Sequence, residues 1–316
     1  MPSNSSRTKI LIVGGGGFLG KNLAELLLSK GQTVRIFERT GYDHLQFPQH
    51  RQVEWHYGDY SLERDISTAL ENIDAVYLFA STTTPKTSND DYSHDIESNL
   101  LATVSFLDIA SKRGIGKVIF PSSGGTVYGI PESSPISEEH ANNPICSYGI
   151  NKLSIEKYLA LFQRQTGLQY TILRISNPYG RYQPANSGQG VITTFLDKAI
   201  RDEEIEIWGD GSVIRDYIYI GDVTRALFHA SNNSSEQNIF NIGSGTGYDL
   251  NQLLSHIEQL LGKKVRKRYI EGRLLDVPKN ILDIGKAKLH LEWEPRFELH
   301  QGLEATAKWL NGSTQN

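Results

Sequence analysis

The sequence has little sulfur: among its 316 residues, Cys146 is the only cysteine and Met1 the only methionine. A single cysteine cannot form an internal disulfide, which excludes a small fold held together by disulfides. The nine histidines show no close metal-ligand spacing, so we predict no metal site. The residues that follow Met1 lack the apolar run of a signal peptide, and we expect a cytoplasmic protein.

A large charge imbalance is also missing. The chain has 32 Lys and Arg against 36 Asp and Glu, with a formal net charge of −4. This balance gives no reason to expect a nucleic acid partner. No segment approaches the roughly 18 apolar residues that a membrane-spanning helix needs, and Glu25 interrupts the apolar run at residues 23–28. We therefore expect no membrane partner either.

The sequence does contain a regular alternation of short apolar runs with helical patterns. Strands are expected at residues 9–13, 33–37, 53–57, 75–80, 117–120 and 169–174, and helices at residues 19–30, 62–71, 92–113 and 147–166. Short, apolar strands of this kind are buried on both faces, as in a parallel sheet covered by helices. The sequence therefore predicts an α/β fold with a doubly wound parallel sheet of the Rossmann type.

After Arg174 the composition changes to segments rich in Gly, Pro, Asn and Tyr, with helices expected at residues 191–201 and 250–261. This texture fits a smaller domain that lies over the carboxyl ends of the strands. We predict a dinucleotide-binding domain and a smaller, interwoven C-terminal substrate domain. The first comprises residues 1–175 with residues near 213–243, and the second comprises residues 176–212 and 244–316.

A glycine-rich loop follows the first expected strand and opens the first helix. Gly14 allows a tight turn, Gly17 lets the backbone approach a pyrophosphate, and Gly20 completes the GxxGxxG spacing. The helix that begins near Phe18 and Leu19 stabilises the negative charge of that pyrophosphate at its amino terminus. The loop therefore predicts a dinucleotide cofactor.

The choice of dinucleotide depends on the end of the second strand. Glu38 stands eighteen residues beyond Gly20, where a carboxylate accepts both hydroxyls of the adenosine ribose, and this favours NAD. Arg39 leaves NADP open, because a guanidinium in this place can hold a 2′-phosphate. Asp59, after the third strand, is placed to accept a hydrogen bond from the adenine amino group.

Tyr148 and Lys152 lie four residues apart and share one helix face. Beside a nicotinamide, the ammonium group is expected to lower the pKa of the phenol, so that the tyrosine exchanges a proton with a substrate hydroxyl near neutral pH. The order and distance of this pair after the glycine loop predict an oxidoreductase-type active site.

These residues resemble the extended short-chain dehydrogenase/reductase family, and within it the nucleotide-sugar epimerases related to UDP-galactose 4-epimerase. The resemblance covers nearly the whole chain. Its motifs are the glycine loop, Gly58-Asp59, Asn99, SSGGTVYG at 122–129, the Tyr148/Lys152 pair, RISNPYG at 174–180, GDGSVIRDYI at 209–218, NIGSG at 241–245, and Arg273 with Asp276 to Pro278. The resemblance implies an NAD-dependent 4-epimerase that oxidises and re-reduces C4 of a UDP-hexose, UDP-N-acetylhexosamine or UDP-hexuronate.

The same resemblance assigns residues to the two ligands. Besides the residues already named, the cofactor-binding positions it implies are Tyr60, Phe79, Ala80, Ser81, Asn99 and Ser122, together with the catalytic pair. The implied substrate-binding positions are Asn177, Val191, Trp208, Arg215, Arg273, Asp276 and Asn280. Two guanidinium groups from separate segments suit a diphosphate, because each can bind its oxygens in bidentate fashion. Asn280 stands where the family controls the width of the sugar pocket.

One position departs from the family pattern. The galactose epimerases have a Ser or Thr three residues before the Val-Tyr-Gly, and here that residue is Gly124. We expect Ser123 or Thr126 to supply the catalytic hydroxyl instead. The following Gly125 and Thr126 also replace the Asp-Glu pair that a 4,6-dehydratase requires, which disfavours elimination chemistry.

Two other functions remain open at this level. A nucleotide-sugar 4-ketoreductase would use the same Tyr148 and Lys152 but release its cofactor in every turnover. A non-catalytic dinucleotide sensor would share the fold, although such sensors generally lack the catalytic pair. The family often dimerises through two helices, here expected at residues 92–113 and 147–166, so a homodimer is expected.

Overall fold

Seven parallel strands form the central sheet in a computed structural model that describes residues 8–42, 44, 47, 49–185, 189–272 and 277–313. The strands occur in the order β10-β6-β5-β4-β1-β2-β3. Their bounds are β1 Lys9–Val13, β2 Thr33–Glu38, β3 Glu54–Tyr57, β4 Ala75–Leu78, β5 Lys117–Ser123, β6 Gln169–Ile175 and β10 Ile239–Ile242. The predicted doubly wound α/β fold is confirmed.

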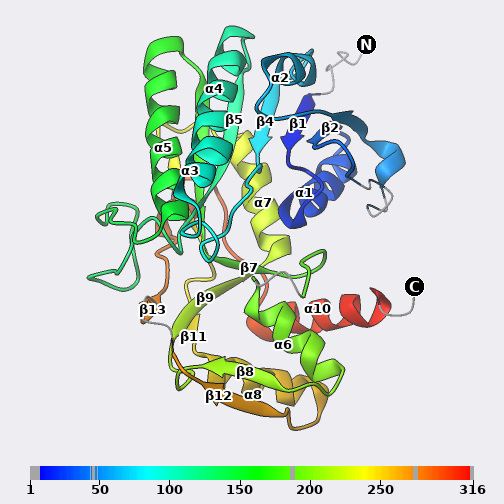
Figure 1. The fold of residues 1–316 in the computed structure, drawn as a ribbon, viewed down its shortest axis with the longest axis vertical. Helices are drawn as coiled ribbons and strands as arrows, with labels where there is room; N and C mark the ends of the chain where they lie inside the picture. Colours follow the sequence, from blue (N-terminus) through cyan, green and yellow to red (C-terminus); the bar gives the residue numbers. More distant parts are fainter. Residues whose placement is uncertain are drawn as a thin grey trace.

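Helices cover both faces of this sheet (Figure 1). On one face lie α1 (Phe18–Ser29) and α7 (Ile220–Ser231); on the other lie α2 (Glu63–Ala69), α4 (Ala102–Lys112) and α5 (Ser147–Thr166). Side chains alternate between the two layers, so Ile10 and Ile12 join the first core while Leu11 and Val13 join the second. Burial on both faces explains why these strands are continuously apolar.

The helix expected at residues 92–113 consists of three pieces. Helix α3 (Tyr92–Asp95) is followed by a π-helical segment, Ile96–Leu101, and then by α4. The wide π turn contains Asn99 and directly follows Asp95, and both side chains are buried. Such turns often occur at functional sites, since they displace side chains from a regular helical stripe.

The C-terminal part forms a second, smaller body. Its strands are β7 (Asn177–Tyr179), β9 (Ile214–Tyr219), β11 (Gly247–Tyr248) and β13 (Lys279–Asn280), with a separate pair of β8 (Ile205–Trp208) and β12 (Lys267–Ile270). Three helices pack around them: α6 (Val191–Ile200), α8 (Leu250–Leu261) and α10 (Leu299–Ser313). Helices α6 and α8 confirm the two expected there, whereas the short strands carry no clear sequence pattern.

The chain passes between the two parts more than once. After β9, the chain forms α7, whose residues pack in the same core as those of α1, and β10, which pairs with β6. Later, α9 (Gly285–His290) returns to that core, where the Trp293 indole nitrogen donates to the Asp222 carbonyl at 3.0 Å. The division into domains at the residues given above stays a prediction.

A buried ion pair connects α5 to the sheet. The Arg174 guanidinium contacts the Glu156 carboxylate, with Nη2 to Oε2 at 2.6 Å, and their side chains are only 2% and 1% exposed. Ser122 donates to the same carboxylate at 2.5 Å, and the Tyr128 hydroxyl lies 3.0 Å from Arg174 Nη1. Strands β5 and β6 are thereby tied to the helix that carries Tyr148 and Lys152.

Glu156→Gln should lower the free energy of unfolding by about 3–5 kcal/mol, because it leaves the buried Arg174 charge without its partner. Urea denaturation of both proteins measures the loss. The control is Asp108→Asn, which breaks the exposed Lys112–Asp108 pair and should cost no more than about 1 kcal/mol. Equal losses in the two variants would contradict the assigned importance of the buried pair.

Candidate active site

The glycine loop lies at the carboxyl edge of the sheet, against the chain that leaves β4. Gly14 has a φ of +74°, and a Cβ atom added to it would stand 2.9 Å from the Ala80 nitrogen. Phe79 N donates to Val13 O at 2.9 Å. Only glycine fits this left-handed, crowded position. The structure therefore brings together Gly14, Phe79 and Ala80, as predicted for a cofactor site.

The amino terminus of α1 is open to an anion. Gly17 is the N-cap and no side chain caps this end, so the first backbone N–H groups of the helix keep their donor capacity. A Cβ on Gly20 would meet the Gly15 Cα at 2.4 Å, which shows how closely the helix packs on its own loop. Backbone donors with a helix dipole behind them fit the pyrophosphate of a dinucleotide.

Glu38 ends β2 beside this loop. Its carboxylate accepts from Gly16 N at 2.8 Å and from Arg39 N at 3.2 Å. Burial raises the pKa of Glu38, while these backbone hydrogen bonds and the Arg39 charge act in the opposite direction. The Arg39 side chain itself is exposed. The acidic group thus lies against the glycine loop, and its contact with the adenosine ribose stays a prediction.

Asp59 and Tyr60 follow β3 on the same side of the site. The Asp59 carboxylate is exposed and accepts from the Ser61 backbone and hydroxyl, which lowers its pKa. Tyr60 is half-buried, with its ring stacked on Phe106 at 5.5 Å. Asp59 therefore presents an acceptor to solvent, whereas Tyr60 packs against α4.

Tyr148 and Lys152 lie on the first two turns of α5. The Lys152 Nζ atom is 5.5 Å from the centroid of the Tyr148 ring and donates to Pro121 O at 3.3 Å. Both residues line a hollow of about 10 Å³, large enough for about one water molecule. The other lining residues are Ala80, Ser81, Asp95, Asn99, Asn151 and Ile155. The hollow joins the predicted catalytic pair to the predicted cofactor loop.

Burial dominates the acidity of this pair. Desolvation of the hydroxyl raises the pKa of Tyr148 to about 12, with smaller upward effects of Cys146 and Asp95. Desolvation lowers the pKa of Lys152 to about 8, opposed by the Glu156 and Asp95 charges. The near-neutral pKa expected for Tyr148 is therefore not reached in the chain alone, because the effect of burial on this pKa exceeds that of the nearby Lys152 ammonium.

Asn99 organises the loop that follows β4. Its carbonyl oxygen accepts from Thr82 N at 2.9 Å, and its amide nitrogen donates to the Asp95 carboxylate at 2.8 Å. Through these bonds Asn99 holds residues 82 and 83 beside the catalytic hollow. Its predicted contact with the cofactor stays a prediction.

The structure explains the glycine at position 124. A Cβ there would lie 2.5 Å from Leu282 Cδ1 and 3.0 Å from the Arg174 carbonyl oxygen. The volume that a Ser or Thr side chain would need is filled by Leu282. A Ser or Thr at position 124 would therefore require Leu282 to move away.

The two expected substitutes differ in their positions. Thr126 packs against Gly149, and its Oγ1 is buried with no hydrogen-bond partner among the described residues. Ser123 is half-buried at the end of β5, and its hydroxyl makes no hydrogen bond to another described residue. Ser122 has its hydroxyl committed to Glu156 in the interior. Of these three hydroxyls, only that of Ser123 is neither buried nor bonded to another described residue, and its role toward a substrate stays a prediction.

Three of the predicted substrate residues meet on one small sheet. Asn177 in β7 pairs with Tyr217 of β9, and Arg215 of β9 pairs with Asn280 of β13. Asn177 donates to the Asp216 carbonyl at 2.9 Å, and the Arg215 guanidinium donates to the Val277 carbonyl at 2.5 Å. The sheet brings these distant positions together beside the carboxyl ends of β5 and β6.

The other predicted substrate positions are more dispersed. Trp208 ends β8 with 42% of its surface exposed, and Val191 begins α6 at the rim of the C-terminal core. Asn280 is buried, with its amide nitrogen donating to Gly124 O at 3.1 Å and its amide oxygen unpartnered among described atoms. Arg273 and Asp276 lie outside the described residues.

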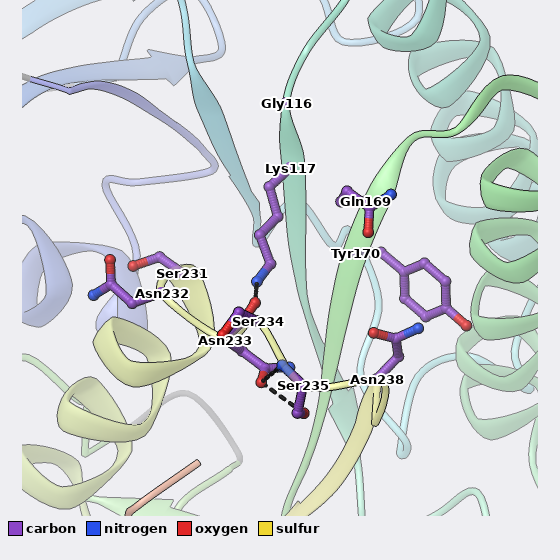
Figure 2. A pocket seen from close by; sticks show the side chains of 10 residues that line it. All are labelled: Gly116, Lys117, Gln169, Tyr170, Ser231, Asn232, Asn233, Ser234, Ser235 and Asn238. Atoms are coloured by element: carbon purple, nitrogen blue, oxygen red, sulfur yellow. Dashed lines mark hydrogen bonds between the residues drawn. The ribbon is translucent and has the colours of Figure 1, made fainter. Parts of the chain in front are cut away.

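A larger hollow, of about 300 Å³, lies at the opposite end of the strands. It is lined by the starts of β5 and β6 and by the turn after α7, and Figure 2 shows Lys117 reaching the Asn233 carbonyl across it at 2.6 Å. Ligands of doubly wound sheets bind at the carboxyl ends of the strands, where the glycine loop lies. This hollow is therefore separate from the candidate active site.

The comparison with known proteins agrees with this geometry. The model of the NAD dependent epimerase/dehydratase family matches residues 10–243. The chain belongs to this family. Membership in this NAD-dependent epimerase/dehydratase family confirms the predicted NAD cofactor and the resemblance to extended short-chain dehydrogenases.

Several relatives of the family are similar over almost their full length. A protein of Methanocaldococcus jannaschii is 33% identical over 97% of this chain and 99% of its own. A dTDP-4-dehydro-6-deoxyglucose reductase of Escherichia coli is 33% identical over 96% of this chain and 98% of its own. The crystal structure of UDP-glucose 4-epimerase with UDP-glucose from Thermotoga maritima has a TM-score of 0.92 and 32% identity, and covers 97% of this chain and 100% of its own.

Neither a metal site nor a membrane-spanning helix is found among the described residues. Within residues 8–42, 44, 47, 49–185, 189–272 and 277–313, no three metal-ligating side chains gather into a site. Over those same ranges, no helix combines the length and the apolar character that crossing a bilayer demands.

Three polar residues beside the catalytic pair carry no recognisable motif. Asp95, Ser147 and Asn151 are buried, and Ser147 and Asn151 each donate a hydrogen bond to the Asp95 carboxylate. A periodic signal does exist, because Ser147 and Asn151 each directly precede a catalytic residue and lie four apart on a helix that packs on a sheet. Polar side chains on a buried helix face require partners, and Asp95 supplies one.

Lys152→Met should change the pH dependence of stability. The folded chain holds the Lys152 proton less tightly than the unfolded chain, since burial lowers its pKa from 10.5 to about 8. Between these two pKa values the unfolded state binds more protons than the folded state, so the contribution of Lys152 to the free energy of unfolding rises with pH. From pH 7 to pH 9.5 the wild type should gain about 2 kcal/mol relative to Lys152→Met in urea denaturation.

Lys112→Met is the matched control for this measurement. Lys112 is exposed, and its hydrogen bond with Asp108 raises its pKa instead of lowering it. Wild type should therefore show no gain over Lys112→Met as the pH rises. A flat difference between wild type and Lys152→Met would contradict the buried, depressed lysine.

Proposed function

We propose that this protein is an NAD-dependent UDP-sugar 4-epimerase. The observation that carries the proposal is the hollow at the carboxyl edge of the sheet, where Tyr148 and Lys152 meet the loop beside Gly14. Relatives named for UDP-glucose 4-epimerase activity, one of them solved with UDP-glucose, support the same function.

The chain's own residues account for the proton chemistry. Tyr148 takes the proton of the sugar hydroxyl and later returns it, and Lys152 favours the charged phenolate by its ammonium group. Ser123 is the hydroxyl that replaces the missing side chain at position 124 and orients the sugar. Bound NAD supplies a hydride acceptor and, as the oxidised form, a cationic ring that further favours the phenolate.

The same proposal assigns the binding residues. Gly14, Gly17 and the amino terminus of α1 hold the pyrophosphate of NAD, and Glu38 accepts from its ribose. Arg215 binds the diphosphate of the UDP-sugar, with Asn177 beside it on the small sheet. Trp208 offers an exposed aromatic face to the uracil. Arg273 and Asp276 keep their expected roles at the diphosphate and the ribose.

The division into two domains is part of this proposal. The parallel sheet and its helices hold NAD, and residues 176–212 and 244–316 hold the nucleotide-sugar. Helix α9 belongs to the second part of the chain but packs in the core shared with α1 and α7, so the two parts share one hydrophobic core.

A 4-ketoreductase is the second candidate, favoured by the 33% identity to a dTDP-4-dehydro-6-deoxyglucose reductase. The two functions need the same proton chemistry and differ in the fate of the cofactor. An epimerase returns the hydride to its own substrate and leaves NAD unchanged, whereas a reductase consumes one reduced cofactor for each product.

The decisive test is a proton NMR time course with UDP-glucose, UDP-galactose, their N-acetyl analogues and UDP-glucuronate, each with NAD. We expect the C4 epimer of at least one substrate to appear, without net formation of NADH. Tyr148→Phe should slow this conversion by about 100- to 10,000-fold, the range typical of losing a general base.

Circular dichroism of Tyr148→Phe serves as the control for folding. Stoichiometric loss of NADH or NADPH on a 4-keto nucleotide-sugar, with no epimer formed from any UDP-sugar, would replace the epimerase by the reductase. Epimer formation that survives in Tyr148→Phe would refute the assigned base.

We further propose a homodimer formed through α4 and α5, which lie side by side on the outer face of the sheet (Figure 1). Helix α5 and the π turn that precedes α4 expose large apolar side chains, including Leu101 at 58% and Ile150 at 51%. Ile150, Tyr158 and Leu161 fall along one face of α5. Exposed apolar side chains grouped in this way are typical of a protein interface.

Replacing both Leu101 and Ile150 with Glu should convert the dimer to a monomer, because two charges would be buried in the interface. Light scattering after size exclusion measures the mass. Leu289→Glu is the matched control, since Leu289 is 73% exposed but lies on α9, far from these helices in the chain. A wild type that is monomeric at micromolar concentration would refute the dimer.

A further inference from the structure

Asp95 is a completely buried carboxylate beside the catalytic helix. None of its surface is exposed, and it accepts four short hydrogen bonds. Oδ1 accepts from Thr83 Oγ1 at 2.5 Å and Asn99 Nδ2 at 2.8 Å, and Oδ2 accepts from Ser147 Oγ at 2.6 Å and Asn151 Nδ2 at 2.8 Å. All four acceptor sites of the carboxylate are therefore used.

Three of these donors come from the loop after β4 and from α5, the two elements that must meet for catalysis, and the fourth, Asn99, comes from the π turn. Thr83 belongs to the loop after β4, whose preceding residues Ala80 and Ser81 line the catalytic hollow. Ser147 and Asn151 stand directly before Tyr148 and Lys152 on α5. A single side chain thus fixes the rotation of α5 and its distance from the cofactor loop.

None of the four donors carries a charge, so the negative charge of Asp95 is left uncompensated by its own hydrogen-bond partners. An isolated buried carboxylate is costly. The other buried carboxylate near Lys152 is Glu156, and it is already bonded to Arg174 at 2.6 Å. Lys152, which lines the same hollow as Asp95, is the cation that remains.

We propose that Asp95 is a positioning residue of the reaction proposed above, holding α5 through Ser147 and Asn151 and serving as the buried counter-charge of the Lys152 ammonium. The inference rests on the proposed function for its effect on turnover. Its effect on Lys152 itself does not depend on any substrate.

The groups that face Lys152 set the direction of the expected change. Tyr148 and Glu156 face it from its own helix, Asp95 from α3, and Arg174 from β6 through its bond with Glu156. Cys146, just before α5, acts on Tyr148. Loss of the Asp95 charge removes one of the two influences that raise the pKa of Lys152, so this pKa falls below about 8.

The first test is a pH titration of the Lys152 side chain by ¹³C NMR of lysine-labelled protein, assigned with Lys152→Met. Asp95→Asn should lower the apparent pKa of Lys152 by about 1 unit or more, as expected when a nearby opposite charge is lost. Asp91→Asn is the matched control: it makes the same change on the N-cap of α3, where Asp91 accepts from His94 N and has no hydrogen bond to a described residue of α5. A shift below about 0.3 units in Asp95→Asn, or an equal shift in Asp91→Asn, overturns the inference.

The second test uses the pH profile of kcat for epimerisation. In Asp95→Asn the alkaline limb should move about 1 unit lower, which reduces kcat about threefold at pH 7.5 and much less at pH 6.5. Asn151→Ala loses one hydrogen bond but keeps the charge, so its limb should stay in place. A uniform loss at every pH, with no movement of the limb, overturns the counter-charge role.

A failure of the proposed function, or a failure of the variant to fold, can be distinguished from a failure of the Asp95 inference. If wild type shows no epimerisation, the proposed function fails, while the NMR titration still decides the role of Asp95. If Asp95→Asn does not fold, Asp95→Asn with Lys152→Met should fold again, because the pair of charges is then removed as a unit. A double variant that stays unfolded overturns the inference.

Discussion

Helix α5 turns polar side chains toward the sheet, and the active site depends on how each of them finds a partner. Along this one face stand Ser147, Asn151, Lys152 and Glu156, all buried. An unpaired buried charge costs several kcal/mol, so each polar side chain on this face must have a hydrogen-bond or charge partner nearby. Arg174 satisfies Glu156 from the sheet, and Asp95 satisfies Ser147 and Asn151 from the neighbouring helix. These bonds fix the orientation of the helix that carries the catalytic pair.

The parallel sheet explains why residues from distant segments meet. Every strand of the sheet ends at the same edge, so the glycine loop after β1, the loop after β4 and the end of β5 converge there. Strand β9 and helix α7 then link this edge to the small sheet that holds Asn177, Arg215 and Asn280. The repeated crossing of the chain between the two parts ties substrate residues to the cofactor edge without a long linker.

Local patterns in the sequence predict the parts of this arrangement that depend on local physics. The strand at residues 9–13 and the helix at residues 147–166 are predicted with their observed bounds, because burial on both faces and the left-handed Gly167 leave clear signals. The π turn within residues 92–113 is not predictable from periodicity, since hydrogen bonds to the loop after β4 stabilise it. The orientation of Thr126 toward Gly149, and of Asn280 toward Gly124, depends on contacts between segments far apart in the chain. Hydrophobic patterns contain no information on such pairs.

The contact between Gly124 and Leu282 links two positions that are 158 residues apart in the chain, since 282 − 124 = 158. Because a methyl group of Leu282 lies in the space that a Cβ on residue 124 would need, a larger residue at 124 requires Leu282 to shift or to be replaced by a smaller residue. Among relatives, a larger residue at the first position should accompany a smaller one at the second. A catalytic hydroxyl at position 124 is therefore coupled to the residue at position 282, and a chain that keeps both Gly124 and Leu282 takes such a hydroxyl from another position.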